Sequence, residues 1–176
     1  MSLSSEEELF EEEKSEWEEC LKEAQEIMNV TERIGIKFKK IPKVPIAGIS
    51  YYSTPIPGIY PTISINPEIC SMKTTRNLKV FVLLHELADF HQNIFKIILY
   101  KTLLFFRSYV LERDSYRYVY DQLTLRIDHD EAKQRMSEFV KEFIYVGDKI
   151  CGKNSVEGLQ ERYNRNIKKY MPFLIE

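Results

Sequence analysis

The chain has 176 residues, of which 44% are hydrophobic and 30% are charged, and its formal net charge is −2. A chain of this length and composition can bury one sizeable core, so we expect a single globular domain rather than a disordered protein. The nearly balanced charge does not favour nucleic acid or an anionic membrane surface as a partner. Three widely spaced cysteines are typical of reduced, buried thiols, and the acidic N-terminus does not resemble a secretory signal, so we expect a cytoplasmic protein.

The first 30 residues predict an acidic amphipathic helix. Apolar residues recur at near-helical spacing from Leu9 to Met28, and nine glutamates precede Cys20. Ser5 and Glu8 fit a capping box. A solvated acidic face is the plain interpretation, and an arm that binds a partner or inhibits the protein is the alternative.

Residues 33–70 predict a small, mostly antiparallel sheet. Apolar and other residues alternate at 34–38, and strand-like segments follow at 47–52 and 62–66, separated by a turn rich in proline and glycine. Proline in such a region favours edge strands over central ones. We therefore expect the strand near 60–66 to lie at the edge of the sheet.

From about residue 75 the pattern is helical nearly to the end. We expect helices at about 77–92, 94–106 and 108–125 in a motif region (75–125), and at about 129–147 and 155–170 in a C-terminal region (129–172). Basic residues interrupt the most apolar run, 94–111, so we interpret it as a core helix and expect no membrane span. The expected N-caps of the last two helices are Asp128 or Asp130, and Asn154 or Ser155.

The segment VFVLLHELADFH at 80–91 carries the most specific motif. It is similar to the H-E-x-x-H helix of zinc peptidases, with aspartate in place of the second histidine. On a helix, His85 and Asp89 lie on one face, and Glu86 lies beside them. The pair could hold a divalent ion while Glu86 acts on a water molecule.

A third ligand is expected from the segment LERDSYRY at 111–118. Glu112 and Ser115 are three residues apart and share a helix face. Ser115 is small enough to let this helix pack closely against the motif helix. Tyr116 or Tyr118 could stabilise an oxyanion, and the sequence does not choose between them.

With these two motifs, residues 45–125 or so resemble the small gluzincins of the ImmA/IrrE type. In that family, a strand ending like ISINP at 63–67 precedes the motif helix, and the glutamate of an E-x-x-A-type motif is the third zinc ligand. The resemblance implies one zincin-like α+β domain over residues 1–176. It also implies that His85, Asp89 and Glu112 hold zinc or another divalent ion and that Glu86 is the general base.

Asp89 departs from the family motif and changes the expected chemistry. The ligands become one imidazole and two carboxylates, which makes the metal a poorer Lewis acid and favours harder ions such as Mn²⁺. We therefore expect a small metal-dependent peptidase of weakened activity. It would bind its metal weakly and cleave peptides slowly, and either property could be lost altogether. The alternative is a catalytically inactive zincin-fold protein that binds a protein partner.

Other polar residues leave further alternatives. The motif helix could instead have a purely structural role, with a core histidine whose hydrogen bonds are made within the protein and with two carboxylates at the surface. His91 lies on another side of a regular helix from His85, and residues 128–131 are typical of a capped helix start, although His129 could approach the site. A nucleic-acid-binding module is a third class of function. Its support is modest and comes from three basic residues that lie among tyrosines: Arg113, Arg117 and Arg126.

Overall fold

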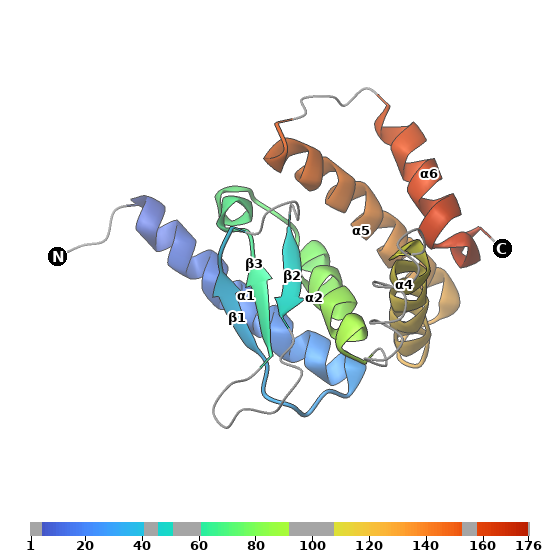
Figure 1. Ribbon diagram of the computed structural model, residues 1–176, viewed down its shortest axis with the longest axis horizontal. Helices are drawn as coiled ribbons and strands as arrows, with labels where there is room; N and C mark the ends of the chain where they lie inside the picture. Colours follow the sequence, from blue (N-terminus) through green and yellow to red (C-terminus); the bar gives the residue numbers. More distant parts are fainter. Residues whose placement is uncertain (1–4, 41–45, 51–60, 92–107, 153–157, 176) are drawn as a thin grey trace.

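The computed structural model describes residues 5–40, 46–50, 61–91, 108–152 and 158–175 (Figure 1). These residues form an α+β domain, as expected. The helix expected at 94–106 lies outside the described residues. In chain order, the elements are α1 (Ser5–Met28), β1 (Gly35–Phe38), β2 (Ala47–Ser50), β3 (Thr62–Ile65), η1 (Pro67–Ser71), α2 (Arg76–His91), α4 (Ser108–Thr124), α5 (His129–Ile150), α6 (Leu159–Tyr170) and η2 (Pro172–Leu174).

The sheet is mixed, so the expectation of a mostly antiparallel sheet was wrong. Its strand order is β1-β3-β2, with β1 parallel to β3 and β2 antiparallel to β3. Parallel pairing requires a long connection, and the chain between β1 and β3 is long enough because it also contains β2. The pairing of Ile63 with both Ile36 and Ile49 fixes the register.

The position of the edge strand also differs from the expectation. The strand expected at the edge, near 60–66, is β3, and it lies at the centre of the sheet with a neighbour on each side. Its side chains Ile63 and Ile65 are fully buried, as a central strand requires. At one end of the described sheet is β2, which packs against α2.

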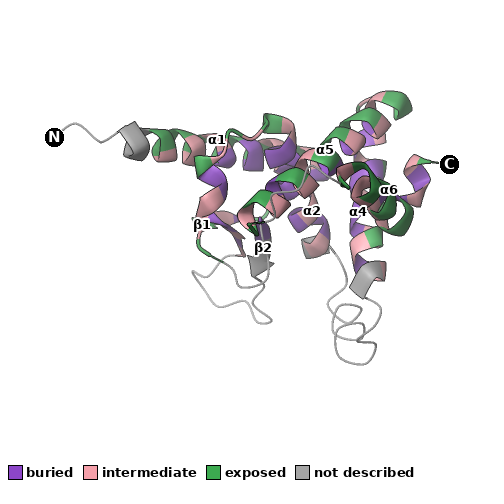
Figure 2. Cartoon of the chain, turned by 90° about the horizontal axis from the view of Figure 1, so that it is seen from above, coloured by how far each residue is buried: buried purple, intermediate pink, exposed green. Residues whose placement is uncertain are grey.

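Helix α1 crosses one face of the sheet and packs along α2 (Figures 1 and 2). Its inner face repeats at helical spacing and is buried; this face comprises Trp17, Cys20, Leu21, Ala24 and Met28. On the α2 side, Lys79 is fully buried and pairs with Glu13 at 2.8 Å and with Glu16. The acidic helix is thus part of the core, and some of its glutamates contact α2.

Helices α4 and α5 pack on the side of α2 that faces away from the sheet, and α6 packs against both of them (Figure 1). Asp128 caps α5 by accepting hydrogen bonds from the backbone N–H groups of Asp130 and Glu131, both at 2.9 Å, as expected. Helix α6 begins at Leu159 with Gly158 as its N-cap, and the expected caps Asn154 and Ser155 lie outside the described residues. Gly158 has a φ of 77°, a backbone conformation that favours glycine. Within the described ranges, no helix combines the length and the apolar character needed to cross a membrane.

Candidate active site

Helix α2 carries the motif and is held firmly at its start. Thr75 accepts a hydrogen bond from the Leu78 N–H at 3.1 Å, and its own N–H donates to Glu142 Oε1 of α5 at 2.8 Å. Residues 80–84 are all buried. His85 and Asp89 follow this buried turn and are partly exposed, whereas Glu86 is buried. The helix therefore places His85 and Asp89 at the edge of the core and Glu86 inside it.

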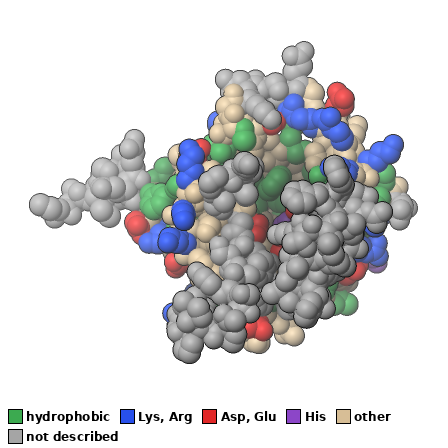
Figure 3. All heavy atoms as spheres, viewed as in Figure 1, with side chains coloured by type: hydrophobic (Ala, Val, Ile, Leu, Met, Phe, Trp, Pro, Cys, Tyr) green, Lys and Arg blue, Asp and Glu red, His purple; other side chains and the backbone are tan. Residues whose placement is uncertain are grey.

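Helix α4 brings its glutamate to the motif histidine. His85 Nε2 lies 3.0 Å from Glu112 Oε2, a hydrogen-bonding distance between side chains on two different helices. The Glu112 side chain is 45% exposed and that of His85 is 14% exposed, so the contact lies where the core meets the surface. In Figure 3, acidic side chains lie beside hydrophobic ones near the centre of the face shown.

The next residues of α4 meet the other motif positions. The Ser115 hydroxyl is fully buried and donates to Asp89 Oδ1 at 2.5 Å. The ring of Tyr116 lies against His85, with ring centroids 4.5 Å apart. Of the two tyrosines left open by the sequence, it is therefore Tyr116 for which a contact with the motif histidine is found. The ring of Tyr116 also faces Phe139 and Tyr170, at centroid distances of 6.3 and 6.5 Å.

The carboxylates determine the protonation of the site. Burial lowers the pKa of His85, but the hydrogen bond to Glu112 and the charges of Glu112, Asp89 and Glu86 outweigh it and raise that pKa to about 9. At neutral pH the imidazole is therefore protonated and forms an ion pair with Glu112. Burial, followed by the same three carboxylates and Tyr170, raises the pKa of Tyr116 far above its usual range, so its phenol stays neutral.

The imidazole and carboxylate groups of this site are of the types that bind divalent metal ions. One imidazole nitrogen and one carboxylate oxygen already lie 3.0 Å apart, which is near the separation of two ligands of one zinc ion bound at about 2.0–2.1 Å. Asp89 would add a second carboxylate. As placed, however, no three His, Cys, Asp or Glu side chains in the described segments form a group that could hold an ion. Metal binding would also have to displace the proton of His85.

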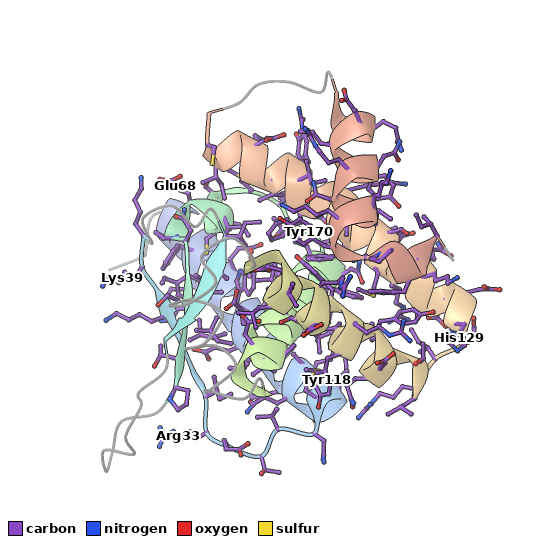
Figure 4. The ribbon with its side chains drawn as sticks, turned by 45° about the vertical axis from the view of Figure 1, so that its right-hand side comes forward. Arg33, Lys39, Glu68, Tyr118, His129 and Tyr170 are labelled. Carbon is purple, nitrogen blue, oxygen red and sulfur yellow. The ribbon has the colours of Figure 1, made fainter. Side chains whose placement is uncertain are left out.

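The remaining histidines do not complete this group in the described structure. His129 Nδ1 is 2.8 Å from the Tyr120 hydroxyl, two turns along α4 from Glu112. Figure 4 shows His129 on the side of the molecule away from the sheet, so the alternative in which it approaches the site was wrong. His91 ends α2, and its side chain lies outside the described residues.

Two features of the site were not predicted from the sequence. Ser115 was expected only to allow close packing, yet its hydroxyl also bonds to Asp89. A polar residue at a position where the family motif has alanine was the available signal. The approach of Tyr116 to His85 was not expected either, because the sequence offered Tyr116 or Tyr118 only as groups that stabilise an oxyanion. The available signal was the helical offset between Glu112 and Tyr116, which places them one turn apart on the same face.

No protein-family model matches the sequence, no curated protein matches it, and no solved structure matches the fold.

Proposed function

We propose that this chain is a zincin-like protein of gluzincin type that hydrolyses peptide bonds slowly. In this proposal, His85, Asp89 and Glu112 hold a divalent metal ion. The observation that carries the proposal is the 3.0 Å contact between His85 Nε2 and Glu112 Oε2, two residues 27 positions apart in sequence. An imidazole that converges with several carboxylates at the core boundary contributes little to stability, and such clusters are typical of functional sites.

A bound divalent ion would supply Lewis-acid polarisation of the scissile carbonyl. The carboxylate of Glu86 would take a proton from the attacking water and deliver it to the departing amine nitrogen. Tyr116 would donate a hydrogen bond to the developing oxyanion, because its raised pKa keeps the phenolic proton in place. Two carboxylates and one imidazole make zinc less favoured than in a site with two imidazoles, and Mn²⁺ correspondingly more competitive.

The peptide substrate would bind along β2 (Ala47–Ser50) and not along β3, which lies at the centre of the sheet. In the described sheet β2 is an end strand, and it packs against α2, the helix that carries His85 and Glu86. An extended peptide can add to such an edge through backbone hydrogen bonds. The proximity of β2 to the motif helix supports this placement.

The test is cleavage of a mixture of unstructured peptides, followed by mass spectrometry with added Zn²⁺ or Mn²⁺. We expect Glu86→Gln to lower cleavage by about 100-fold or more and to leave metal binding in equilibrium dialysis unchanged. Glu138→Gln is the matched control, because Glu138 is exposed on α5, and it should cleave like the wild type. Undiminished cleavage by Glu86→Gln would remove Glu86 from the mechanism, and absence of metal binding by the wild type would reject the metal site.

A second candidate function is that of a catalytically inactive zincin-fold protein that binds a protein partner. One observation favours it: in the described ranges the site residues pair with one another and do not form a three-donor group that could hold an ion. The two polar contacts would then join α2 to α4, and the partner would bind the β2 edge or the acidic face of α1. An intact fold with no bound metal and no cleavage would favour this function.

A further inference from the structure

Asp89 and Ser115 both depart from the motif that the chain resembles, and the structure joins them. Asp89 stands where that motif has its second histidine, and Ser115 stands where it has alanine. The two residues lie on different helices, 26 positions apart, and their side chains are hydrogen-bonded at 2.5 Å. Two departures that meet in one contact suggest a common reason.

The Ser115 hydroxyl has a second acceptor besides Asp89, within its own helix. It also lies 3.0 Å from the Leu111 carbonyl oxygen, the usual acceptor for a serine inside a helix. One hydroxyl carries one proton, so it can donate fully to only one of the two oxygens. The carboxylate bond is the shorter of the two and is assisted by charge, so it is the stronger.

The bond also limits how the Asp89 carboxylate can turn. Ser115 is fully buried and therefore fixed in place, while Asp89 is partly exposed. Aspartate is shorter than histidine and would reach a shared ion only from a restricted orientation. Ligating carboxylates are commonly oriented by such hydrogen bonds, and removal of the partner typically costs about 10–100-fold in metal affinity.

We propose that Ser115 is a positioning residue that orients the Asp89 carboxylate, so that the Asp89–Ser115 pair together replaces a histidine–alanine pair. This inference rests on the proposed metal site. It predicts that the effect of Ser115 depends on which residue occupies position 89. With Asp89 present, the hydroxyl is needed; with histidine at that position, alanine at 115 gives the larger ring more room.

The experiment measures Mn²⁺ and Zn²⁺ affinity by isothermal titration calorimetry for four proteins. These are the wild type, Ser115→Ala, Asp89→His, and the double variant Asp89→His/Ser115→Ala. We expect Ser115→Ala to weaken binding by about 10-fold or more in the wild type, and to leave it unchanged or strengthen it in the Asp89→His background. An equal effect of Ser115→Ala in both backgrounds would overturn the inference while leaving the proposed function in place.

A second measurement separates failure of the pair from failure of the metal site. Melting temperatures in EDTA are compared for wild type, Asp89→Ala, Ser115→Ala and the double variant Asp89→Ala/Ser115→Ala. We expect the single shifts not to add, because each variant removes the same hydrogen bond. If the wild type binds neither ion, the proposed function fails and the role of Ser115 toward a metal fails with it. Additive shifts would overturn the pair itself.

Discussion

Lys79 is the residue whose burial most needs an explanation. Its side chain is fully buried in the interface between α1 and α2, where it pairs with Glu13 and Glu16. Burial lowers the pKa of a lysine, but the two glutamates outweigh that effect and raise the pKa of Lys79 above its usual value. The lysine is therefore charged in the folded protein, and its partners compensate for the cost of burial.

We predict that Lys79→Met destabilises the protein by about 2–3 kcal/mol, because Glu13 is left partly buried without its partner. Methionine has a similar length, so the loss would come from the charge and not from a cavity. The free energy of unfolding in urea measures the effect. Adding Glu13→Gln to Lys79→Met should recover part of the loss, whereas a loss that persists in full would show that packing, and not charge, is responsible.

The matched control for this prediction is Lys14→Met. Lys14 lies on α1 with 41% of its side chain exposed, and it pairs with Glu11 at 3.2 Å. An exposed ion pair contributes little, so this variant should differ from the wild type by less than about 0.5 kcal/mol.

At the residue scale, the sequence predicted which groups could meet but not how they would bond. Helical spacing and the motif resemblance indicated that His85 and Glu112 could lie together, and the structure brings them within 3.0 Å of each other. The bond from Ser115 to Asp89 depends on how α2 and α4 pack, which no local pattern determines. The same holds for Lys79, because its glutamate partners are more than 60 positions away.

At the element scale, the motif helix α2 depends on a residue from another helix. Glu142 of α5 accepts hydrogen bonds from both the N–H and the hydroxyl of Thr75, the residue that precedes α2. Thr75 in turn accepts from the Leu78 N–H. This arrangement satisfies backbone groups that the first turn of a helix leaves without partners.

We predict that Glu142→Ala destabilises the protein by about 1–2 kcal/mol, because two hydrogen bonds to a carboxylate are lost at the start of α2. Glu138→Ala is the control: it makes the same substitution one turn earlier on α5, at an exposed residue that bonds only to Gln134 among the contacts found. Urea unfolding of both variants measures the difference. Equal losses would mean that helix propensity or solvation, and not the Thr75 contact, explains the result.

The same scale separates the predictable elements from the others. Helices at 77–92, 108–125 and 129–147 were predicted within about three residues at either end, because their apolar residues recur every three or four positions. The strands were located correctly, but the expected antiparallel pairing and the expected edge position of the strand near 60–66 were wrong. Strand partners lie far apart in sequence, and proline placement near β3 indicated an edge where the structure has a centre.

At the scale of the whole molecule, the burial of two cysteines shows how tightly α1 and η1 pack onto the core. Cys20 lies on α1 and Cys70 on η1, and these two elements pack against each other. Both thiols are buried, and burial is the main cause that raises the pKa of each from 9.0 to about 11. Cys151, at the end of α5, is exposed.

We predict that one thiol of the native protein reacts rapidly with Ellman's reagent and that all three react in urea. The fast thiol should be Cys151, because the other two become accessible only when α1 and η1 separate from the core. The Cys151→Ala variant is the control and should show no fast reaction. Rapid reaction of a second thiol in that variant would show that α1 or η1 opens locally.

The raised pKa values of Cys20 and Cys70 also predict how the stability of the whole fold changes with pH. Each thiol ionises near pH 9 in the unfolded chain and near pH 11 in the folded protein, so its contribution is complete below pH 9 and is lost as pH rises to 11. By pH 10.5 the wild type should lose roughly 1–2 kcal/mol per thiol relative to Cys20→Ala/Cys70→Ala. Urea unfolding of both proteins at pH 8 and pH 10.5 measures this loss. Subtracting the free energy of unfolding of the double variant from that of the wild type removes the contribution of all other titrating groups, which the two proteins share. A difference that does not change with pH would mean that the thiols are not shielded from water as their burial indicates.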